Sequence, residues 1–521
     1  MKSKKYFSTR IAIIVALGGF LMGFDASVIS GVVRFIEPEF GLSKLQIGWA
    51  VGSLTLTATL AMLFSGRLSD HYGRRYVLKI AAVLFAVSAI LSAVAPTFTL
   101  FVLARMLGGF GVGAALIIAP MYIAEIAPPK LRGRLVSVNQ LNIVLGISAA
   151  FFSNYFLLQW AQSDSAFVQA IMLDVHVWRW MLGIEAIPAI IYFIGLQFVP
   201  RSPRWEIMKG EKESALSTLE KLLSSEEAQK QLTDVVDSLK KDENSPKVTF
   251  RDLLHPYLRY VLYVGLILAI LQQITGINAV FFYAPIIFEQ SGIGADASFM
   301  QAVLVGLTNL GFTIVAMLFI DKIGRKPLLL IGLTGIAIMM SLLAYGFHSA
   351  TYQIDRAEIE ALELPFDTAP LTELHGITYS NDITFKRAIA EAIGEEAALE
   401  FEIAIIETAI DINPRLILFA ILGFVASFAI SLGPVMWVMF SELFPLRYRG
   451  LAISFAGFVN SMVSFLVQLV FPWELANFGN SITFLIYGLF AAAGLFFVWK
   501  VVPETKNKSL EELEEQLVRK S

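Results

Sequence analysis

The sequence contains no cysteine and is poor in charged residues. Because none of its 521 residues is cysteine, a disulfide scaffold, thiolate-bound zinc, iron–sulfur clusters and thiol catalysis are excluded. Only 16% of the residues are charged, whereas a soluble globular chain has about 25%. So few polar groups cannot cover a water-soluble particle of this size, and an ordinary soluble protein is therefore excluded as well.

Two further shortages concern partners and chemistry. The formal net charge is only −3, so the chain lacks the basic field that attracts nucleic acid. Its five histidines are scattered without the spacing of metal ligands, and no Ser–His–Asp or phosphate-loop pattern occurs. We therefore expect no metal site, no cofactor, no nucleic-acid partner and no enzymatic activity.

What the chain does have is long apolar stretches. Hydrophobic residues make up 56% of it, and the mean hydropathy is +0.67. About 20 apolar residues cross the hydrocarbon core of a bilayer as one helix. We find twelve such stretches, near residues 10–33, 45–66, 76–95, 98–123, 135–160, 178–199, 258–289, 299–320, 327–347, 415–440, 451–471 and 482–502. The sequence therefore predicts an all-α membrane protein with twelve transmembrane helices.

The first stretch follows a basic N-terminus and resembles a signal peptide in that respect. However, Asp25 follows without a clear small-residue cleavage site, so we expect this stretch to remain as the first span.

Lysine and arginine are concentrated in alternate loops, which predicts the orientation. On one side of the expected membrane only Arg34 and Lys44 lie in the short loops. The short loops of the other side carry eleven basic residues, namely Arg67, Arg74, Arg75, Lys130, Arg132, Arg134, Lys322, Arg325, Lys326, Arg447 and Arg449. Since basic loops stay in the cytoplasm, the sequence predicts a multi-pass protein of the cell membrane with both termini cytoplasmic.

Two polar inserts interrupt the apolar pattern and define the expected domains. The first predicts cytoplasmic helices at 211–223 and 226–241. The second, residues 348–414, is expected outside the cell, has fourteen acidic residues against three basic ones, and predicts an amphipathic helix at 385–410. A solvated cap without chemistry is the simpler interpretation of this second insert. The expected domains are an N-terminal six-helix bundle (1–200), a helical linker (201–257), a C-terminal six-helix bundle (258–502) and a cytoplasmic tail (503–521).

A charged pattern recurs once in each half of the chain. The sequence GRLSDHYGRR (66–75) after the second span has a counterpart in DKIGRK (321–326) after the eighth. A glutamate with an arginine seven residues later follows both the fourth and the tenth spans. Duplicated six-span halves are typical of transporters whose substrate site lies between the halves. The residues of these motifs are Arg67, Asp70, Arg74, Arg75, Glu125, Arg132, Asp321, Arg325, Glu442 and Arg449.

Acidic and guanidinium groups at helix ends can form ion pairs between neighbouring spans and between the halves. Such pairs would close a cytoplasmic gate and break when that side opens. The alternative is that the motifs only set topology through their positive charge.

At these residues the chain resembles the sugar porter family of the major facilitator superfamily, most closely its bacterial proton-coupled xylose- and inositol-type symporters. The resemblance covers nearly the whole chain. Besides the two motifs above, it rests on PMYIAEIAPPKLRGRL (120–135), PRSPRW (200–205), QQITGIN (272–278), GPVMWVMFSELFPLRYRG (433–450) and PETK (503–506). It implies two pseudo-symmetric six-helix bundles, cytoplasmic helices between them, and alternating access by rocking.

Three amides lie within an otherwise apolar seventh span, which indicates a sugar site. Gln272, Gln273 and Asn278 can donate to and accept from hydroxyl groups without bringing net charge into the membrane. On an unbroken helix they would point in different directions, whereas a break at Gly276 would allow them to converge. The alternative role for any single amide is to hold helices together.

The resemblance adds further sugar contacts from other spans. They are Gln140, Asn309, Trp437 and Asn460. The chain departs from the family pattern at Ser461, where many relatives have an aromatic residue, and this departure leaves the choice of sugar open. Two other departures, Arg201 and Asn507, lie in the cytoplasmic motifs.

The resemblance also points to Asp25, Arg105 and Glu185 as a proton-coupling group. A carboxylate within a span is costly unless it is paired or protonated, and the resemblance places Asp25 within reach of Arg105. The alternative is a permanent ion pair that fixes the first and fourth spans together.

The sequence thus predicts secondary active transport of a monosaccharide or polyol by alternating access, with proton symport. The expected partners are the sugar, the proton and the lipid bilayer, and we expect the protein to work as a monomer. A facilitative sugar uniporter on the same fold is the main alternative. A sugar receptor and a drug exporter fit less well, because only about twenty residues follow the last span and because the seventh span is rich in amides.

Overall fold

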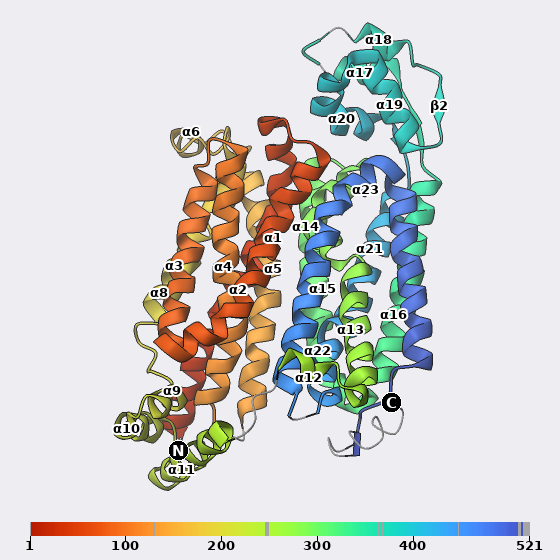
Figure 1. Ribbon diagram of the computed structural model, residues 1–521. Coiled ribbons are helices and arrows are strands. Elements are labelled where there is room, and N and C mark those ends of the chain that lie inside the picture. The colour runs from red at the N-terminus through yellow and green to blue at the C-terminus, as the bar shows by residue number, and fades with distance from the viewer. Residues whose placement is uncertain are drawn as a thin grey trace. The chain divides into compact units, whose positions relative to one another are not determined.

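The computed structural model describes residues 2–128, 131–244, 249–362, 364–366, 368–445, 447–508 and 512–513. The described chain is mainly helical (Figure 1) and forms two compact units. The first unit contains residues 1–28, 53–150 and 179–254, and the second contains residues 29–52, 151–178 and 255–521. The second unit therefore includes the ends of several helices from the N-terminal half of the chain.

Within the described residues, eleven helical segments are long and apolar enough to cross a membrane. The last is α23 (Arg449–Lys500), whose 52 residues include Gly479 at φ 74°. A straight helix of that length would extend about 78 Å, far beyond the roughly 30 Å of hydrocarbon. The turn at Gly479 divides α23 into the predicted eleventh and twelfth spans, and the prediction of twelve spans is confirmed.

The N-terminal half begins with long, nearly uninterrupted helices. They are α1 (Lys2–Phe40), α2 (Lys44–Tyr72), α3 (Arg74–Ala93), α4 (Phe98–Ile126) and α5 (Arg132–Ala161). The sixth span is split into α7 (Val177–Gly183) and α8 (Ala186–Gly195), after the short α6 (Ala166–Ala170). Several helices extend beyond the predicted stretches, because polar residues at their ends continue the helical hydrogen bonds.

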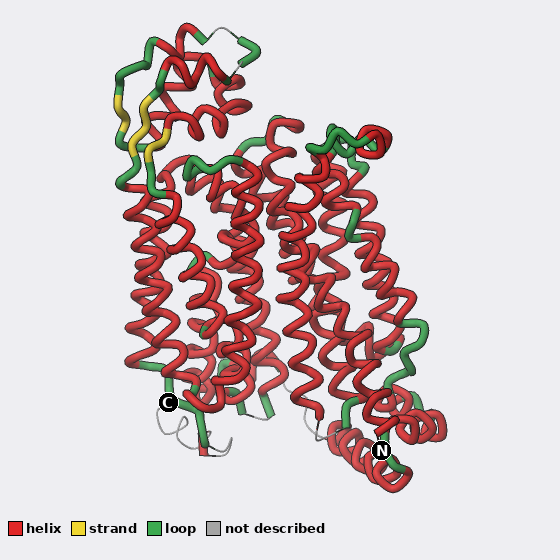
Figure 2. Tube along the Cα trace, turned by 180° about the vertical axis from the view of Figure 1, so that it is seen from behind, coloured by secondary structure: helices red, strands yellow, loops and turns green. Residues whose placement is uncertain are grey.

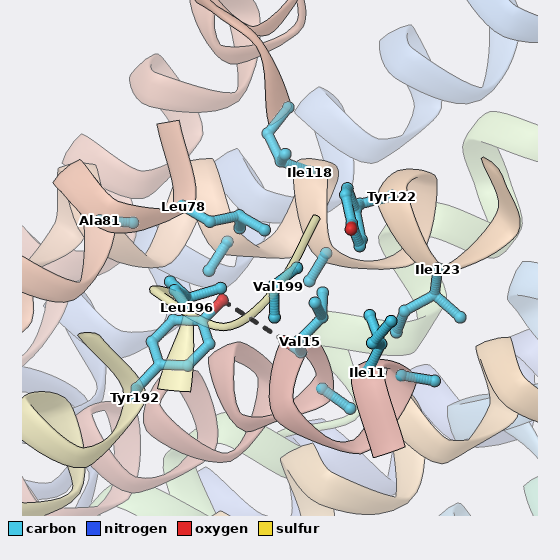
Figure 3. Close-up of a cluster of buried hydrophobic side chains, with 14 of the residues drawn as sticks. Ile11, Val15, Leu78, Ala81, Ile118, Tyr122, Ile123, Tyr192, Leu196 and Val199 are labelled. Atoms are coloured by element: carbon cyan, nitrogen blue, oxygen red, sulfur yellow. Dashed lines mark hydrogen bonds between the residues drawn. The ribbon is translucent and has the colours of Figure 1, made fainter. Parts of the chain in front are cut away.

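Apolar side chains from α1, α3, α4 and α8 form a large part of the core of the first unit. Figure 3 shows Ile11 and Val15 of α1 facing side chains of α3, α4 and α8. Tyr192 is fully buried there, and its hydroxyl donates to the backbone oxygen of Val15 at 3.4 Å. Small residues allow the helices to approach closely, as is typical of membrane helices. A Cβ atom on Gly111, for example, would lie 3.1 Å from the backbone oxygen of Ala81.

The linker helices also belong to the first unit. They are α9 (Pro203–Met208), α10 (Lys212–Leu222), α11 (Ser225–Asn244) and α12 (Phe250–Leu253). Helices α10 and α11 match the two predicted linker helices. Ser202 caps α9 by accepting from the backbone N–H of Trp205 at 3.2 Å, as a serine at this position commonly does.

Broken spans are a feature of the second unit. The seventh span consists of α13 (Arg259–Ile274) and α14 (Ile277–Glu289), and the tenth consists of α21 (Pro414–Ile430) and α22 (Leu432–Leu443). Between them α15 (Ala295–Ile323) and α16 (Arg325–His348) are continuous. The predicted break at Gly276 is confirmed, since this residue has φ 89°, a conformation that glycine adopts at little cost.

The second polar insert forms a small folded body, which we call the cap (residues 349–413), at the end of the second unit opposite the chain's C-terminal residues (Figure 1). Figure 2 shows its three strands, which form an antiparallel sheet in the order β2–β1–β3. Tyr352 lies opposite both Tyr379 and Ile410 in that sheet. The elements of the cap are β1 (Thr351–Gln353), α17 (Arg356–Ala361), α18 (Ala369–Thr372), β2 (Thr378–Tyr379), α19 (Asp382–Ile393), α20 (Glu395–Ala409) and β3 (Ile410–Asp411).

The prediction of one amphipathic helix within the cap is wrong. Gly394 has φ 85° and separates α19 from α20, because a residue in this conformation ends a helix. The two helices fold onto each other around Phe385, which is fully buried and stacks on Tyr352 at 5.2 Å between ring centroids. The cap therefore has its own apolar core.

Candidate functional site

A network of buried amides joins the broken seventh span to α23. Gln273 donates to the Oδ1 atom of Asn460 at 3.1 Å, and Asn460 donates to the Oε1 atom of Gln272 at 2.8 Å. Asn278 donates to the Oε1 atom of Gln273 at 2.8 Å and to the hydroxyl of Ser464 at 2.6 Å. Four of the seven predicted sugar contacts thus hydrogen-bond to one another inside one unit.

The break at Gly276 explains how residues so differently spaced meet. Gln272 and Gln273 lie in the last turn of α13, whereas Asn278 lies in the first turn of α14. Because the chain changes direction at Gly276, Asn278 reaches the side chain of Gln273 five residues earlier. A Cβ atom on Gly276 would lie 2.6 Å from a ring carbon of Tyr487, so close packing holds the break in place.

The other three predicted sugar contacts lie elsewhere. Asn309 is buried in α15, and no hydrogen bond among the described residues joins it to the amide network. Trp437 in α22 is 41% exposed, with its ring edge-on to Phe440 and above Gly457 of α23. Gln140 is half-buried in α5 and belongs to the first unit.

Two polar residues of this region were missed by sequence reasoning. Ser464 accepts from both Asn278 and Gln468, the latter at 2.8 Å, and the hydroxyl of Tyr283 donates to the backbone oxygen of Gln468 at 2.9 Å. Together with Asn460, Ser464 and Gln468 have a spacing of four residues, which puts them on one helix face. This spacing is visible in the sequence and could have identified both residues, because it places a polar stripe along an apolar span.

The predicted coupling residues meet in the first unit. The carboxylate of Asp25 in α1 pairs with the guanidinium of Arg105 in α4, and Arg105 also donates to the backbone oxygen of Asp25 at 3.1 Å. Both side chains are buried. Glu185, also buried, lies at the break between α7 and α8 and interacts electrostatically with both of them.

One oxygen of each carboxyl group in this cluster lacks a hydrogen-bond partner. These are the Oδ2 atom of Asp25 and the Oε1 atom of Glu185, both fully buried. A buried carboxyl oxygen without a partner is costly when ionised. Gly108 makes room for this arrangement, because a Cβ atom there would lie 2.9 Å from the Oδ2 atom of Asp25.

The charged motifs form ion pairs between helices of the same unit. In the first unit Arg74 pairs with Asp70 at 2.8 Å and with Glu125 at 3.1 Å, and Glu125 also accepts from the hydroxyl of Ser202. Arg74 is almost fully buried although it carries a charge, so it ties the ends of α2, α3 and α4 together.

The second unit repeats this arrangement. Arg325 pairs with Asp321 at 3.1 Å and with Glu442 at 2.7 Å, and Glu442 also accepts from the hydroxyl of Thr505 at 2.6 Å. Thr505 takes the place that Ser202 has in the first unit, so the PETK and PRSPRW motifs have equivalent positions. Ion pairs between neighbouring spans are therefore present in both units.

The remaining gate residues have other surroundings. Arg75 donates to the backbone oxygens of Leu196 and Gln197 at 3.0 and 2.8 Å, and Arg449 donates to the backbone oxygen of Phe444 at 3.1 Å. Arg67 is exposed, and the side chain of Arg132 lies outside the described residues. Arg75 and Arg449 therefore cap helix ends and Arg67 faces outward, and only Arg74 and Arg325 centre an ion-pair cluster among the described motif residues.

The chain matches a family model over most of its length. The model is that of the sugar (and other) transporter family, and it matches residues 11–358 and 402–517. Residues 359–401, which lie inside the cap, fall between the two matched segments.

Individual proteins with a similar sequence are transporters. The chain is 32% identical to the arabinose-proton symporter of Bacillus subtilis, covering 98% of this chain and 96% of that protein. It is 33% identical to the major myo-inositol transporter of the same organism, covering 98% of this chain and 94% of that protein. Both similarities extend through the two units and the linker.

Solved structures agree with the fold. The xylose transporter XylE from Escherichia coli, in a partially occluded inward-open conformation, superposes with a TM-score of 0.73 at 31% identity. The alignment covers 97% of this chain and all of that one.

Proposed function

Because the chain belongs to the sugar transporter family of the major facilitator superfamily, we propose that it carries a monosaccharide or polyol through the cell membrane by alternating access, in symport with protons. The protein is a multi-pass membrane transporter and not an enzyme. The relatives above are named for arabinose, myo-inositol and xylose, and all three are small neutral polyhydroxyl compounds.

The amide network is the observation that carries this proposal. Each amide has both N–H donors and an oxygen acceptor, and a sugar hydroxyl group can bond to both because it donates and accepts hydrogen bonds. Gln272, Gln273, Asn278 and Asn460 hydrogen-bond to one another, so hydroxyl groups can replace these contacts without leaving a buried polar atom unpaired. Gln140, Asn309 and Trp437 are the further proposed contacts.

Proton coupling is assigned to the cluster of Asp25, Arg105 and Glu185. One guanidinium and two carboxyl groups have zero net charge only when one carboxyl holds a proton. A buried cluster favours zero net charge, and losing that proton leaves an extra negative charge in the core of the first unit. We propose that this change alters the Asp25–Arg105 pair and thereby the packing of α1 on α4.

Orientation and gating complete the proposal. The distribution of lysine and arginine supports cytoplasmic termini, which puts the linker inside the cell and the cap outside. The charge clusters centred on Arg74 and Arg325 then form the cytoplasmic gate, with residues 1–200 and 258–502 as the bundles that rock. The protein is proposed to work as a monomer.

The test is uptake by purified protein in liposomes, with a panel of labelled pentoses, hexoses and inositols. We expect at least one of them to accumulate above its outside concentration when an inward proton gradient is imposed, and to equilibrate without one. Equilibration under both conditions would support the alternative of a uniporter, and no uptake of any panel member would contradict sugar transport.

A further inference from the structure

The cap is the part of the chain that the family match does not explain. Residues 359–401 fall between the matched segments, so the transport cycle shared by the family does not require them. Yet the cap has its own apolar core and specific contacts to the helices beneath it.

One set of contacts fixes the cap to α23. The carboxylate of Asp382 accepts from the backbone N–H and the side-chain amide of Asn480, both at 3.1 Å. Gly479 leaves the space for it, because a Cβ atom there would lie 2.4 Å from the Oδ1 atom of Asp382. At its base the cap also meets the turn after α14, where Ile410 lies against Gly292. The cap is therefore anchored to the C-terminal half of the chain.

The cap also faces the corner between α1 and α2, which comes from the N-terminal half. This corner (residues 34–48) packs against C-terminal helices within the second unit. Arg34 pairs with the buried Glu289 of α14 at 2.5 Å. Gly48 lies directly on α23, since a Cβ atom there would meet the backbone oxygen of Leu469 at 1.9 Å.

A cavity of about 390 Å³ separates the cap from this corner and from α14. Six charged residues line it, and four of them form two short pairs. Lys44 pairs with Glu37 at 2.6 Å within the corner, and Lys386 pairs with Glu402 at 2.7 Å within the cap. Since these charges are already balanced within each side, they do not call for a charged ligand.

Glu402 also interacts with the lysine on the other side of the cavity. Its burial alone would raise its pKa, but the positive charges of Lys386 and Lys44 outweigh burial and lower the pKa to about 2. Since Lys44 and Glu402 line the same cavity with opposite charges, an attraction links the cap to the corner across it, in addition to the pairs within each side.

We propose that the cap is an extracellular latch that stabilises the outward-closed state, with Glu402 on the C-terminal half attracting Lys44 on the N-terminal half. This inference rests on the proposed function, because alternating access requires the α1–α2 corner to leave the C-terminal helices when the outer side opens. The pairs within each side survive that movement, whereas the Arg34–Glu289 pair and the attraction of Glu402 for Lys44 are both lost. Single ion pairs of this kind shift a two-state equilibrium by about two- to fivefold.

The experiment exploits the absence of cysteine from the natural chain. Ile47 lines the cavity and is only 3% exposed, so an Ile47→Cys variant reacts with a membrane-impermeant thiol reagent only when the corner moves away. In this background we expect Lys44→Gln and Glu402→Gln each to raise the labelling rate about two- to fivefold. Glu395→Gln is the matched control, because Glu395 lines the same cavity and forms no ion pair among the described residues.

The double variant separates a latch from two unrelated defects. If Lys44 and Glu402 act on each other, the double variant labels no faster than the faster single variant. The latch would be overturned if the increases in labelling rate of the two single variants multiply in the double variant. It would also be overturned if neither single variant changes the labelling rate. The labelling needs no sugar, so a protein that transports none of the panel but shows the coupled response contradicts the proposed function and leaves the latch standing.

Discussion

At the scale of single residues, the buried charges of the first unit are the feature that most needs a function. Asp25, Arg105 and Glu185 form a cluster of two carboxyl groups and one guanidinium away from water. A purely structural ion pair would need only one carboxyl group. The second one makes the charge of the cluster depend on a proton, which is what coupling to a proton gradient requires.

The first prediction concerns this proton. In Asp25→Asn the cluster can no longer cycle between two charge states at that position, so proton-driven accumulation of sugar should be lost. Exchange of labelled for unlabelled sugar should persist, because the amide network lies in the other unit. Asp164→Asn, at an exposed loop position, is the control and should accumulate sugar normally. Full accumulation by Asp25→Asn would rule out Asp25 as the proton carrier.

The second prediction concerns the amide network. Gln273→Ala removes a side chain that hydrogen-bonds Gln272, Asn278 and Asn460. Losing such a polar contact to a bound sugar costs about 1–2 kcal/mol, so the KM for uptake should rise roughly tenfold. Asn477→Ala removes an exposed amide of α23, the helix that contributes Asn460 to the network, and should leave KM unchanged. An equal change in both variants would mean that Gln273 has no special role in binding.

At the scale of elements, breaks in helices bring the polar groups together. The seventh span breaks at Gly276, the tenth at Ser431 and the sixth beside Glu185. Two of these three breaks lie next to residues proposed to bind sugar or protons. Gln272 also joins two broken spans, by donating to the backbone oxygen of Leu432, the first residue of α22, at 3.0 Å.

The third prediction tests the break in the seventh span. Gly276→Ala puts a side chain at φ 89° and against the ring of Tyr487. The left-handed conformation alone costs roughly 1–2 kcal/mol, so the melting temperature and the uptake rate should both fall. Gly311→Ala is the matched control, because Gly311 lies in α15 with open space around it; there alanine should be neutral or slightly stabilising. Equal melting temperatures for the two variants would contradict the strained break.

The fourth prediction concerns pH and the cap. Because Lys386 and Lys44 lower the pKa of Glu402 to about 2, its contribution to stability is complete above its ordinary pKa near 4.5. That contribution, on the order of 2 kcal/mol, is lost only as pH falls toward 2. Glu402→Gln should therefore lower the melting temperature by the same amount at pH 7.5 and at pH 5.5. If Glu402→Gln leaves the melting temperature unchanged at both pH values, the pKa of Glu402 is not lowered.

At the scale of the whole molecule, the repeated arrangement of the two halves extends to individual contacts. Arg74, Glu125 and Ser202 in the first unit have the same relation as Arg325, Glu442 and Thr505 in the second. In the first unit the cluster joins the start of α3 to a glutamate near the end of α4 and to a hydroxyl after α8. In the second unit it joins the start of α16 to a glutamate near the end of α22 and to a hydroxyl after α23.

The fifth prediction concerns orientation in the membrane. Glu373→Cys in the cap and Glu213→Cys in α10 both create a single exposed thiol. In intact cells an impermeant maleimide should label only the cap variant, and the α10 variant should react only after the membrane is opened. Labelling of α10 in intact cells would reverse the orientation proposed from lysine and arginine.

Sequence reasoning predicted the spans well because apolar length is a local property. The twelve stretches and the break at Gly276 are visible as runs of residue types. The cap is different. Its single predicted helix is split by Gly394, and its sheet pairs Tyr352 with residues far along the chain. Such pairings depend on tertiary contacts that no short pattern records.

The candidate site shows the same limit. Gln272, Gln273 and Asn278 are visible as polar residues in an apolar stretch, whereas Ser464 and Gln468 are ordinary small or polar residues until α23 packs on α14. The pairing of Asp25 with Arg105 came from resemblance, because 80 residues separate them and sequence spacing alone could not bring them together.

The attachment of Asp382 beside Gly479 has a practical consequence. Since the turn between the last two spans is hydrogen-bonded to α19, any tilt of those spans carries the folded cap along with it. A fluorophore or antibody fragment bound to its outer helices would report the movement of the C-terminal bundle in real time, without touching the pathway of the solute.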